Sequence, residues 1–132
     1  MKNILLVEDS TLIREGISKI LDKAGYTVFE ANDGKEALTV FATNEIDLVI
    51  TDILMPNMCG IDLITKLGEL FPEIPVIAMS GGARYNNSVN CLEAAVFFGA
   101  SRTIEKPFKP VQLIDLISSI SELDKNISFM NA

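Results

Sequence analysis

The chain has 132 residues, a length that fits one domain with its own hydrophobic core. Hydrophobic residues make up 48% and charged residues 22%, and the net charge of −7 argues against a nucleic-acid-binding surface. Histidine is absent from the sequence, which excludes a Ser-His-Asp or Cys-His catalytic set and any histidine-ligated metal.

No apolar run reaches the roughly 18 residues that a membrane-spanning helix needs. The first residues, MKNILLVEDS, become acidic after a few apolar positions, unlike a signal peptide. Cys59 and Cys91 are far apart and lack metal-ligand spacing, which favours free thiols in a reducing compartment. We therefore expect a cytoplasmic protein that does not insert into membranes.

Taken in chain order, the hydrophobic patterns predict strands that alternate with helices. Apolar runs predict five strands, over residues 3–7, 26–31, 46–51, 75–80 and 101–105. Amphipathic segments predict five helices, the first from Ser10 or Thr11 to about Gly25 and the others over about 34–43, 60–70, 88–98 and 110–123. The apolar face of the first helix should comprise Leu12, Ile13, Ile17, Ile20 and Leu21.

This alternation predicts an α/β fold with a parallel sheet. The strands at 3–7, 46–51 and 75–80 are apolar at nearly every position, as central strands covered by helices on both faces must be. We expect the domain to occupy residues 1–124 and residues 125–132 to form a frayed tail.

Polar side chains stand where four of the predicted strands end. They are Glu8 and Asp9 after the first strand, Asp52 after the third, Ser80 after the fourth and Lys106 after the fifth. In an open parallel sheet these ends lie along one edge, where ligands bind. The five side chains should therefore converge in one cleft, although they are distant in the sequence.

Three carboxylates, one hydroxyl and one amine suit a particular chemistry. Carboxylates about 4 Å apart repel each other by several kcal/mol at an effective dielectric near 20, and a hard divalent cation relieves this repulsion. Oxygen ligands with room for water suit Mg²⁺, or Mn²⁺ in its place. One carboxylate can also act as a nucleophile and become an aspartyl phosphate.

At this point the sequence resembles the receiver domains of two-component response regulators. The resemblance rests on four stretches in the family's order, ILLVEDS, DLVITDILMPNMCG, PVIAMSG and KPF, and also on GYTVFEANDGKEAL. It covers about residues 2 to 123. It implies a flavodoxin-like, doubly wound five-stranded sheet in the order 2-1-3-4-5, with five helices.

The resemblance also implies a role for each matching residue. Asp52 would accept the phosphoryl group. Mg²⁺ would be held by Asp9, by Asp52, by Glu8 through water and by the backbone carbonyl of Leu54. Ser80 and Lys106 would contact the phosphoryl oxygens, and Pro107 would fix the following turn, in the family often through a cis bond.

Three features depart from the family pattern. Thr103 stands where receivers usually carry the Tyr or Phe that moves inward on phosphorylation, so we expect Thr103 to follow Ser80 passively or another element to carry the signal. The loop 81–88 is longer than usual and begins with the flexible pair Gly81 and Gly82; it is either a partner contact or a tolerated insertion. The side chains of Leu54 and Gly82 cannot activate water, which predicts slow loss of the phosphoryl group.

The predicted function is a phosphorylation-dependent signalling switch, not an enzyme beyond its own phosphorylation and dephosphorylation. A histidine kinase or a phosphotransfer protein would donate the phosphoryl group. The output would be onward transfer, or a protein target bound through the face formed by the fourth helix, fifth strand and fifth helix. The alternatives are a phosphorylation-independent pseudo-receiver and, with less support, a Mg²⁺-dependent phosphatase of the haloacid-dehalogenase type or a flavin-binding flavodoxin-like protein.

Overall fold

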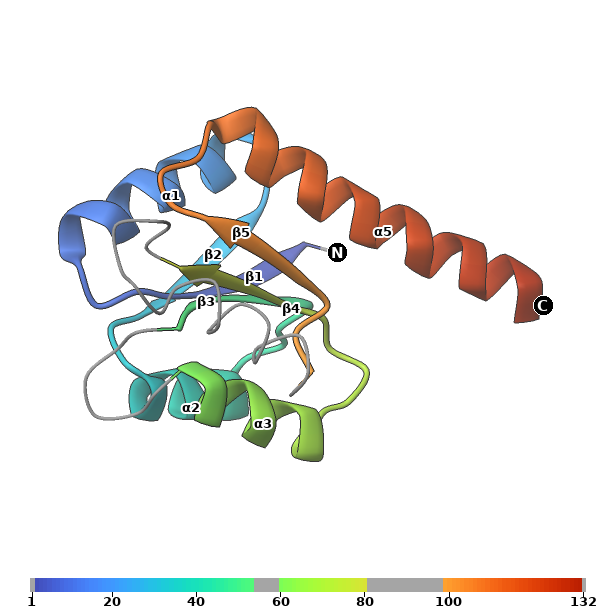
Figure 1. Cartoon of the computed structure of the whole chain (residues 1–132). Coiled ribbons are helices and arrows are strands. Elements are labelled where there is room, and N and C mark those ends of the chain that lie inside the picture. The colour runs from blue at the N-terminus through green and yellow to red at the C-terminus, as the bar shows by residue number, and fades with distance from the viewer. Residues whose placement is uncertain (1, 54–59, 81–98, 132) are drawn as a thin grey trace.

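The computed structural model describes residues 2–53, 60–80 and 99–131. Five parallel strands form one sheet in the order β2-β1-β3-β4-β5, which confirms the predicted fold class and strand order (Figure 1). The strands are β1 (Asn3–Val7), β2 (Thr27–Ala31), β3 (Leu48–Asp52), β4 (Val76–Ser80) and β5 (Arg102–Glu105). The described helices are α1 (Thr11–Lys23), α2 (Gly34–Thr43), α3 (Gly60–Leu70) and α5 (Pro110–Asn131).

Helices cover both faces of the sheet, as its apolar strands require. On one face, α2 and α3 pack over Leu5, Val7 and Val49. On the other face, α1 and α5 pack over Ile4, Leu6, Leu48, Ile50 and Ile77. Successive residues of β1 therefore enter opposite layers of the core, and each fully buried aliphatic side chain contributes about 1.5–3 kcal/mol of stability.

Local signals set the ends of the helices. The hydroxyl of Ser10 accepts a hydrogen bond from the backbone N–H of Ile13, and the carboxylate of Asp33 accepts one from Glu36, so both act as N-caps. Gly25 follows α1 with φ of 95°, a conformation that favours glycine.

The last helix ends later than expected, and the apolar face of the first is only partly buried. α5 extends to Asn131, so the segment expected as a frayed tail is helical up to that residue. After Pro110 this segment contains no glycine or proline that would end the helix. In α1, Ile17 and Leu21 of the expected apolar face are buried, whereas Leu12 is 82% and Ile13 39% exposed, because the first turn projects past the carboxyl ends of the strands (Figure 1).

Several expectations fall outside the described residues. They are the helix over 88–98, the loop 81–88 with Gly81 and Gly82, and the carbonyl of Leu54.

Candidate functional site

The strand order places the predicted polar residues along one edge of the sheet. β3 lies at the centre, between β1 and β4, and Asp52 is its last residue. Glu8 and Asp9 follow β1 directly, on the strand next to β3. The crevice at the carboxyl ends of β1 and β3, where the strand order reverses, is the usual ligand site of an open α/β sheet.

Glu8, Asp9 and Asp52 form an acidic cluster, hereafter the acidic pocket. One carboxylate oxygen of each lies within 4.8 Å of the corresponding oxygens of the other two. Glu8 is 1% and Asp52 5% exposed, whereas Asp9 is open to solvent. Oxygen donors at this spacing fit a hard divalent cation that keeps some of its water.

Lys106 reaches into the same pocket from the end of β5. Its Nζ donates to Oδ2 of Asp52 at 3.0 Å and to Oε2 of Glu8 at 3.1 Å. The backbone N–H of Lys106 donates to the carbonyl of Ser80 at 2.7 Å, and the peptide bond to Pro107 is cis. Four residues that are distant in the sequence thus meet in one network of short contacts.

Ser80 belongs to β4, which pairs with the strand of Asp52, and Thr103 belongs to β5, one strand further out. Ser80 ends β4, is 1% exposed and pairs in register with Glu105 of β5. Thr103 lies in the interior of β5, opposite Ala78, and is half-buried. Both therefore lie on the β4–β5 side of Asp52, Ser80 on the adjacent strand and Thr103 on the strand beyond it.

The environment of the pocket shifts the pKa values of Glu8 and Lys106, which are hydrogen-bonded to each other. Burial raises the pKa of Glu8 to about 7, and repulsion from Asp52 adds to this effect against the opposing attraction of Lys106. Burial alone would lower the pKa of Lys106. The hydrogen bonds and the negative charges of Asp52 and Glu8 outweigh burial, so the pKa of Lys106 is raised above its ordinary value. Among the described residues, three carboxylates thus face one lysine in the pocket, an arrangement that suits a further cation.

Arg14 supports the acidic pocket and was not predicted as a site residue. From the first turns of α1, its Nη1 donates to the backbone carbonyl of Glu8 at 2.8 Å and its Nε to Oε1 of Glu30 at 3.2 Å. It therefore ties the segment carrying Glu8 and Asp9 to β2 and α1. The available sequence signal was a basic residue one turn into the helix that follows an acidic strand end.

Fold and pocket together define a class of signalling protein, the receiver domains of response regulators. The family model for the response regulator receiver domain matches residues 4–118, and the chain belongs to this family. Receiver domains of two-component systems accept phosphoryl groups from histidine kinases, so the chain is a phosphorylation-dependent signalling switch.

Individual relatives are similar over most of the chain. The chemotaxis protein CheY of Thermotoga maritima is 32% identical, with 92% of this chain and 98% of that protein covered. The phosphate regulon transcriptional regulatory protein PhoB of Pseudomonas aeruginosa is 34% identical, with 90% of this chain covered, and the chain spans about half (51%) of PhoB. Among solved structures, the chemotaxis protein CheY4 of Vibrio cholerae superposes with a TM-score of 0.81 at 29% identity, covering 90% of this chain and 98% of that one.

No helix in the described parts of the chain combines the length and apolar character needed to cross a membrane.

Proposed function

We propose that Asp52 is the phosphoacceptor of this receiver. Its carboxylate is at the centre of the pocket and accepts a hydrogen bond from Nζ of Lys106 at 3.0 Å, and this observation carries the proposal. In the transfer, an Asp52 oxygen forms the new bond to phosphorus while the bond from phosphorus to the donor's histidine nitrogen breaks. The ammonium of Lys106 is placed to balance charge on the phosphoryl oxygens.

Glu8, Asp9 and Asp52 hold Mg²⁺ in this proposal, with the backbone carbonyl of Leu54 as a further ligand. Their oxygen donors lie within 4.8 Å of one another and include no nitrogen or sulfur, which suits Mg²⁺. When bound, Mg²⁺ would lower the repulsion among the carboxylates and the incoming phosphoryl group. Because Lys106 pairs with Glu8 and Asp52 in this structure, a cation would share these carboxylates with it.

The remaining assignments concern the switch. Ser80, the last residue of β4, would bond the phosphoryl group, Thr103 would follow it, and Gly81 and Pro107 would shape the adjoining loops. Neither Leu54 nor Gly82 offers a group that could activate water, so hydrolysis of phosphorylated Asp52 is slow. Residues 1–124 make up the receiver domain.

The partners follow from the same scheme. A histidine kinase or phosphotransfer protein supplies the phosphoryl group. The output is onward transfer or a protein target bound at the face formed by the expected fourth helix, β5 and α5. The net charge of −7 argues against nucleic acid as a partner.

Intact mass after incubation with acetyl phosphate tests the proposal. The wild type should gain one phosphate, about 80 Da, only with Mg²⁺ present, and Asp52→Asn should gain none. Asp47→Asn is the matched control, because Asp47 is an exposed carboxylate at the opposite end of the same strand. A wild type that gains no phosphate and fails to bind beryllofluoride would instead be a phosphorylation-independent binding module.

A further inference from the structure

Arg14 joins three elements beside the acidic pocket through two of its nitrogens. Its Nη1 donates to the backbone carbonyl of Glu8 at 2.8 Å, and its Nε donates to Oε1 of Glu30 at 3.2 Å. The Arg14 side chain is 17% exposed, whereas that of Glu30, on the edge strand β2, is 44% exposed. Because the guanidinium is a rigid plane, the two contacts hold the Glu8 carbonyl at a fixed distance from the Glu30 carboxylate.

The carbonyl that Arg14 binds belongs to the peptide bond between Glu8 and Asp9. This peptide group is planar, so a hydrogen bond that fixes the direction of its carbonyl also fixes the direction of the Asp9 N–H. Three residues, Glu8, Asp9 and Ser10, lie between the end of β1 and the first residue of α1. A rotation of this peptide plane therefore changes the position of Asp9 relative to Glu8.

The two acidic side chains on either side of this peptide bond are held differently. The carboxylate of Glu8 accepts hydrogen bonds from Nζ of Lys106 at 3.1 Å and from the backbone N–H of Ser10 at 3.3 Å. Asp9, in contrast, is open to solvent. Glu8 is thus fixed through its own side chain, whereas the exposed side chain of Asp9 takes its position from the backbone that Arg14 holds.

We propose that Arg14, held in place by Glu30, is a positioning residue that sets the affinity of the acidic pocket for Mg²⁺ and its preference for Mg²⁺ over Ca²⁺. This role rests on the metal assignment of the proposed function. Mg²⁺ requires nearly octahedral oxygen ligands at about 2.0–2.1 Å, whereas Ca²⁺ accepts less regular ligands at about 2.3–2.6 Å. A pocket in which the Asp9 oxygen is less firmly placed therefore loses more affinity for Mg²⁺ than for Ca²⁺.

The positive charge of Arg14 makes the direction of the effect informative. A cation beside three carboxylates repels a second cation, so the loss of the Arg14 charge alone would strengthen Mg²⁺ binding. The loss of a residue that positions Asp9 weakens Mg²⁺ binding in spite of the removed repulsion. The sign of the change in Arg14→Gln therefore separates positioning from charge.

The test is a titration of the ¹⁵N-labelled full chain with MgCl₂ and with CaCl₂, followed by NMR. In the wild type, MgCl₂ should shift the amide signals of Asp9 and Asp52. Arg14→Gln should weaken Mg²⁺ binding about tenfold, as expected for a residue that orients a metal ligand, and should weaken Ca²⁺ binding less. Arg14→Lys keeps the charge but cannot make both contacts from one rigid plane, so it should also weaken Mg²⁺ binding.

Glu30→Gln tests whether Glu30 acts through Arg14. It removes the charge that holds Arg14 and should weaken Mg²⁺ binding about threefold, the size expected for an exposed ion pair. In the Arg14→Gln background the same substitution should have no further effect, because the interaction is already absent. An equal loss in both backgrounds would overturn the role of Glu30, since Glu30 would then act on the pocket through its own charge.

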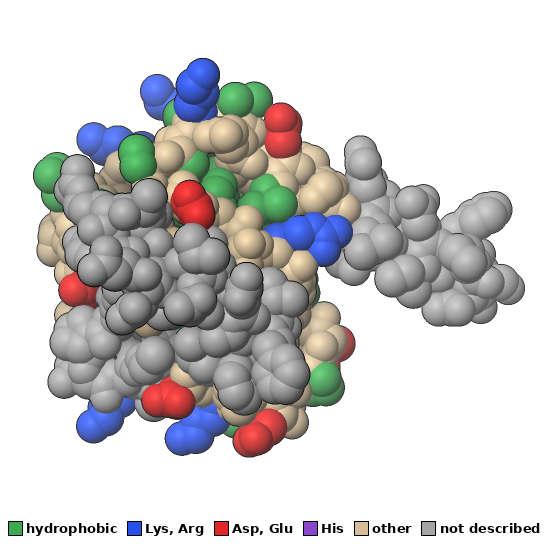
Figure 2. Space-filling view, viewed as in Figure 1, with side chains coloured by type: hydrophobic (Ala, Val, Ile, Leu, Met, Phe, Trp, Pro, Cys, Tyr) green, Lys and Arg blue, Asp and Glu red, His purple; other side chains and the backbone are tan. Residues whose placement is uncertain are grey.

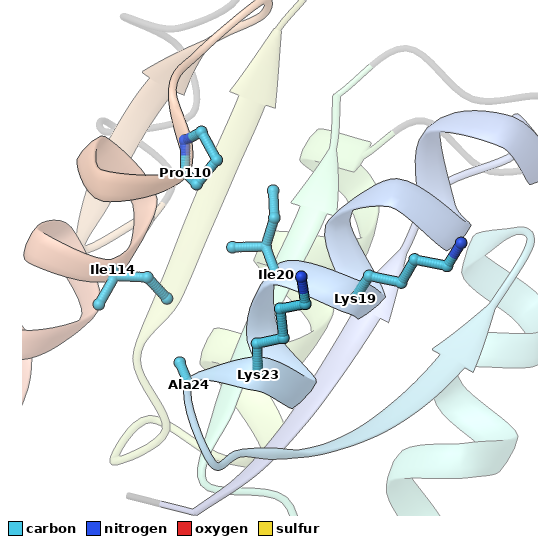
Figure 3. A pocket seen from close by; sticks show the side chains of 6 residues that line it. All are labelled: Lys19, Ile20, Lys23, Ala24, Pro110 and Ile114. Carbon is cyan, nitrogen blue, oxygen red and sulfur yellow. The ribbon is translucent and has the colours of Figure 1, made fainter.

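Lys19→Gln is the matched control, because it also removes one positive charge from α1. Lys19 is exposed and borders a separate hollow between α1 and α5, together with Ile20 and Ile114 (Figure 3). Figure 2 shows Lys and Arg side chains at several separate places on one face of the molecule, as expected for solvated charges. Lys19→Gln should leave Mg²⁺ affinity within about twofold of the wild type, since solvent and salt screen its charge.

Three results with Arg14→Gln would overturn the proposal. They are Mg²⁺ binding as tight as in the wild type, tighter Mg²⁺ binding, and equal weakening of Mg²⁺ and Ca²⁺ binding. A wild type whose Asp9 and Asp52 signals do not respond to MgCl₂ would overturn the metal assignment itself, and the role of Arg14 with it. If the amide spectrum shows that Arg14→Gln is unfolded, Arg14→Lys and Glu30→Gln decide, because each must weaken Mg²⁺ binding more than Ca²⁺ binding.

Discussion

Along β1 and β3, the middle of each strand is apolar and its carboxyl end carries buried charge, although the two regions are only about two residues apart. Ile50 is fully buried among aliphatic side chains, and two positions later Asp52 is 5% exposed beside two other carboxylates. Burial of the apolar side chains in the middle of the strand stabilises the fold. Burial of the carboxylates at its end costs free energy, because a low-dielectric environment disfavours charge. Signalling chemistry is therefore built where the sheet stops contributing apolar packing, and the neighbouring core must supply the stability that holds the carboxylates together.

The largest expected effect comes from the strand middle. Ile50→Ala should lower the free energy of unfolding by about 2–5 kcal/mol, since it removes a fully buried side chain between α1, α5 and the sheet. Urea unfolding measures the change. Leu12→Ala is the control, because Leu12 is 82% exposed and should change stability by less than about 0.5 kcal/mol. Comparable losses in both variants would contradict the contrast between the core and the surface of α1.

Removing Lys106, which pairs with Glu8 and Asp52, should have the next largest effect. Lys106→Met leaves the buried carboxylates of Glu8 and Asp52 without their shared partner and should destabilise the fold by about 1–3 kcal/mol at pH 8. At pH 5 the loss should be smaller, because Glu8, whose pKa is about 7, is then protonated. Lys109→Met, at an exposed lysine three residues later, should show neither effect in the same unfolding experiment.

The pKa of Glu8 predicts a pH dependence of stability with a defined sign. Its folded-state pKa of about 7 lies above the ordinary value of 4.5, so between these values the native chain keeps a proton that the unfolded chain loses. This contribution to stability is present below pH 4.5 and is lost as the pH rises to about 7, at no more than about 1.4 kcal/mol per pH unit.

Unfolding free energies from pH 4.5 to 8 for the wild type and Glu8→Gln isolate this contribution. Their difference should vary with pH in the stated direction, while Glu15→Gln, at an exposed position of α1, should run parallel to the wild type. A constant difference between the wild type and Glu8→Gln would show that Glu8 titrates normally.

The smallest expected effect is at the other end of β3. Asp47 accepts hydrogen bonds from the backbone N–H groups of Asn3 at 2.8 Å and Lys2 at 3.0 Å, and these bonds lower its pKa. Its stabilising contribution is present above the ordinary pKa of 3.8 and is lost as the pH falls through the lower folded-state pKa. Asp47→Ala should cost about 0.5–1.5 kcal/mol at pH 7, measured by urea unfolding, and less at pH 3. A cost that grows on acidification would reverse this assignment.

The fold was predictable because it follows from short sequence patterns that repeat along the chain. Strands that are apolar on both faces require helices on both sides, and polar residues at the ends of four strands required a common edge. The convergence of Glu8, Asp9, Asp52 and Lys106 was predicted on this basis. The length of α5 was not, because a helix without a terminating glycine or proline has no local stop signal in the sequence.

Other features depend on tertiary structure that no local pattern encodes. The exposure of Leu12 and Ile13 follows from where the sheet ends beneath α1, and periodicity reports only which side chains share a helix face. The contacts of Arg14 with the Glu8 carbonyl and with Glu30 join three separate elements. The raised pKa of Glu8 depends on its burial and on its distance to Asp52, and both exist only after folding.

The continuation of α5 beyond the sheet has a mechanical consequence for anything joined to it (Figure 1). From Ile120 to Asn131 the helix advances about 16 Å, with about 100° of rotation for each residue. A reporter module fused in continuous helix after Asn131 would therefore be a rigid lever whose facing direction depends on the linker length. Two added residues turn it about 200° away, and seven return it to within about 20° of its starting direction. Signal transmission through such a fusion should rise and fall with the helical period of the linker.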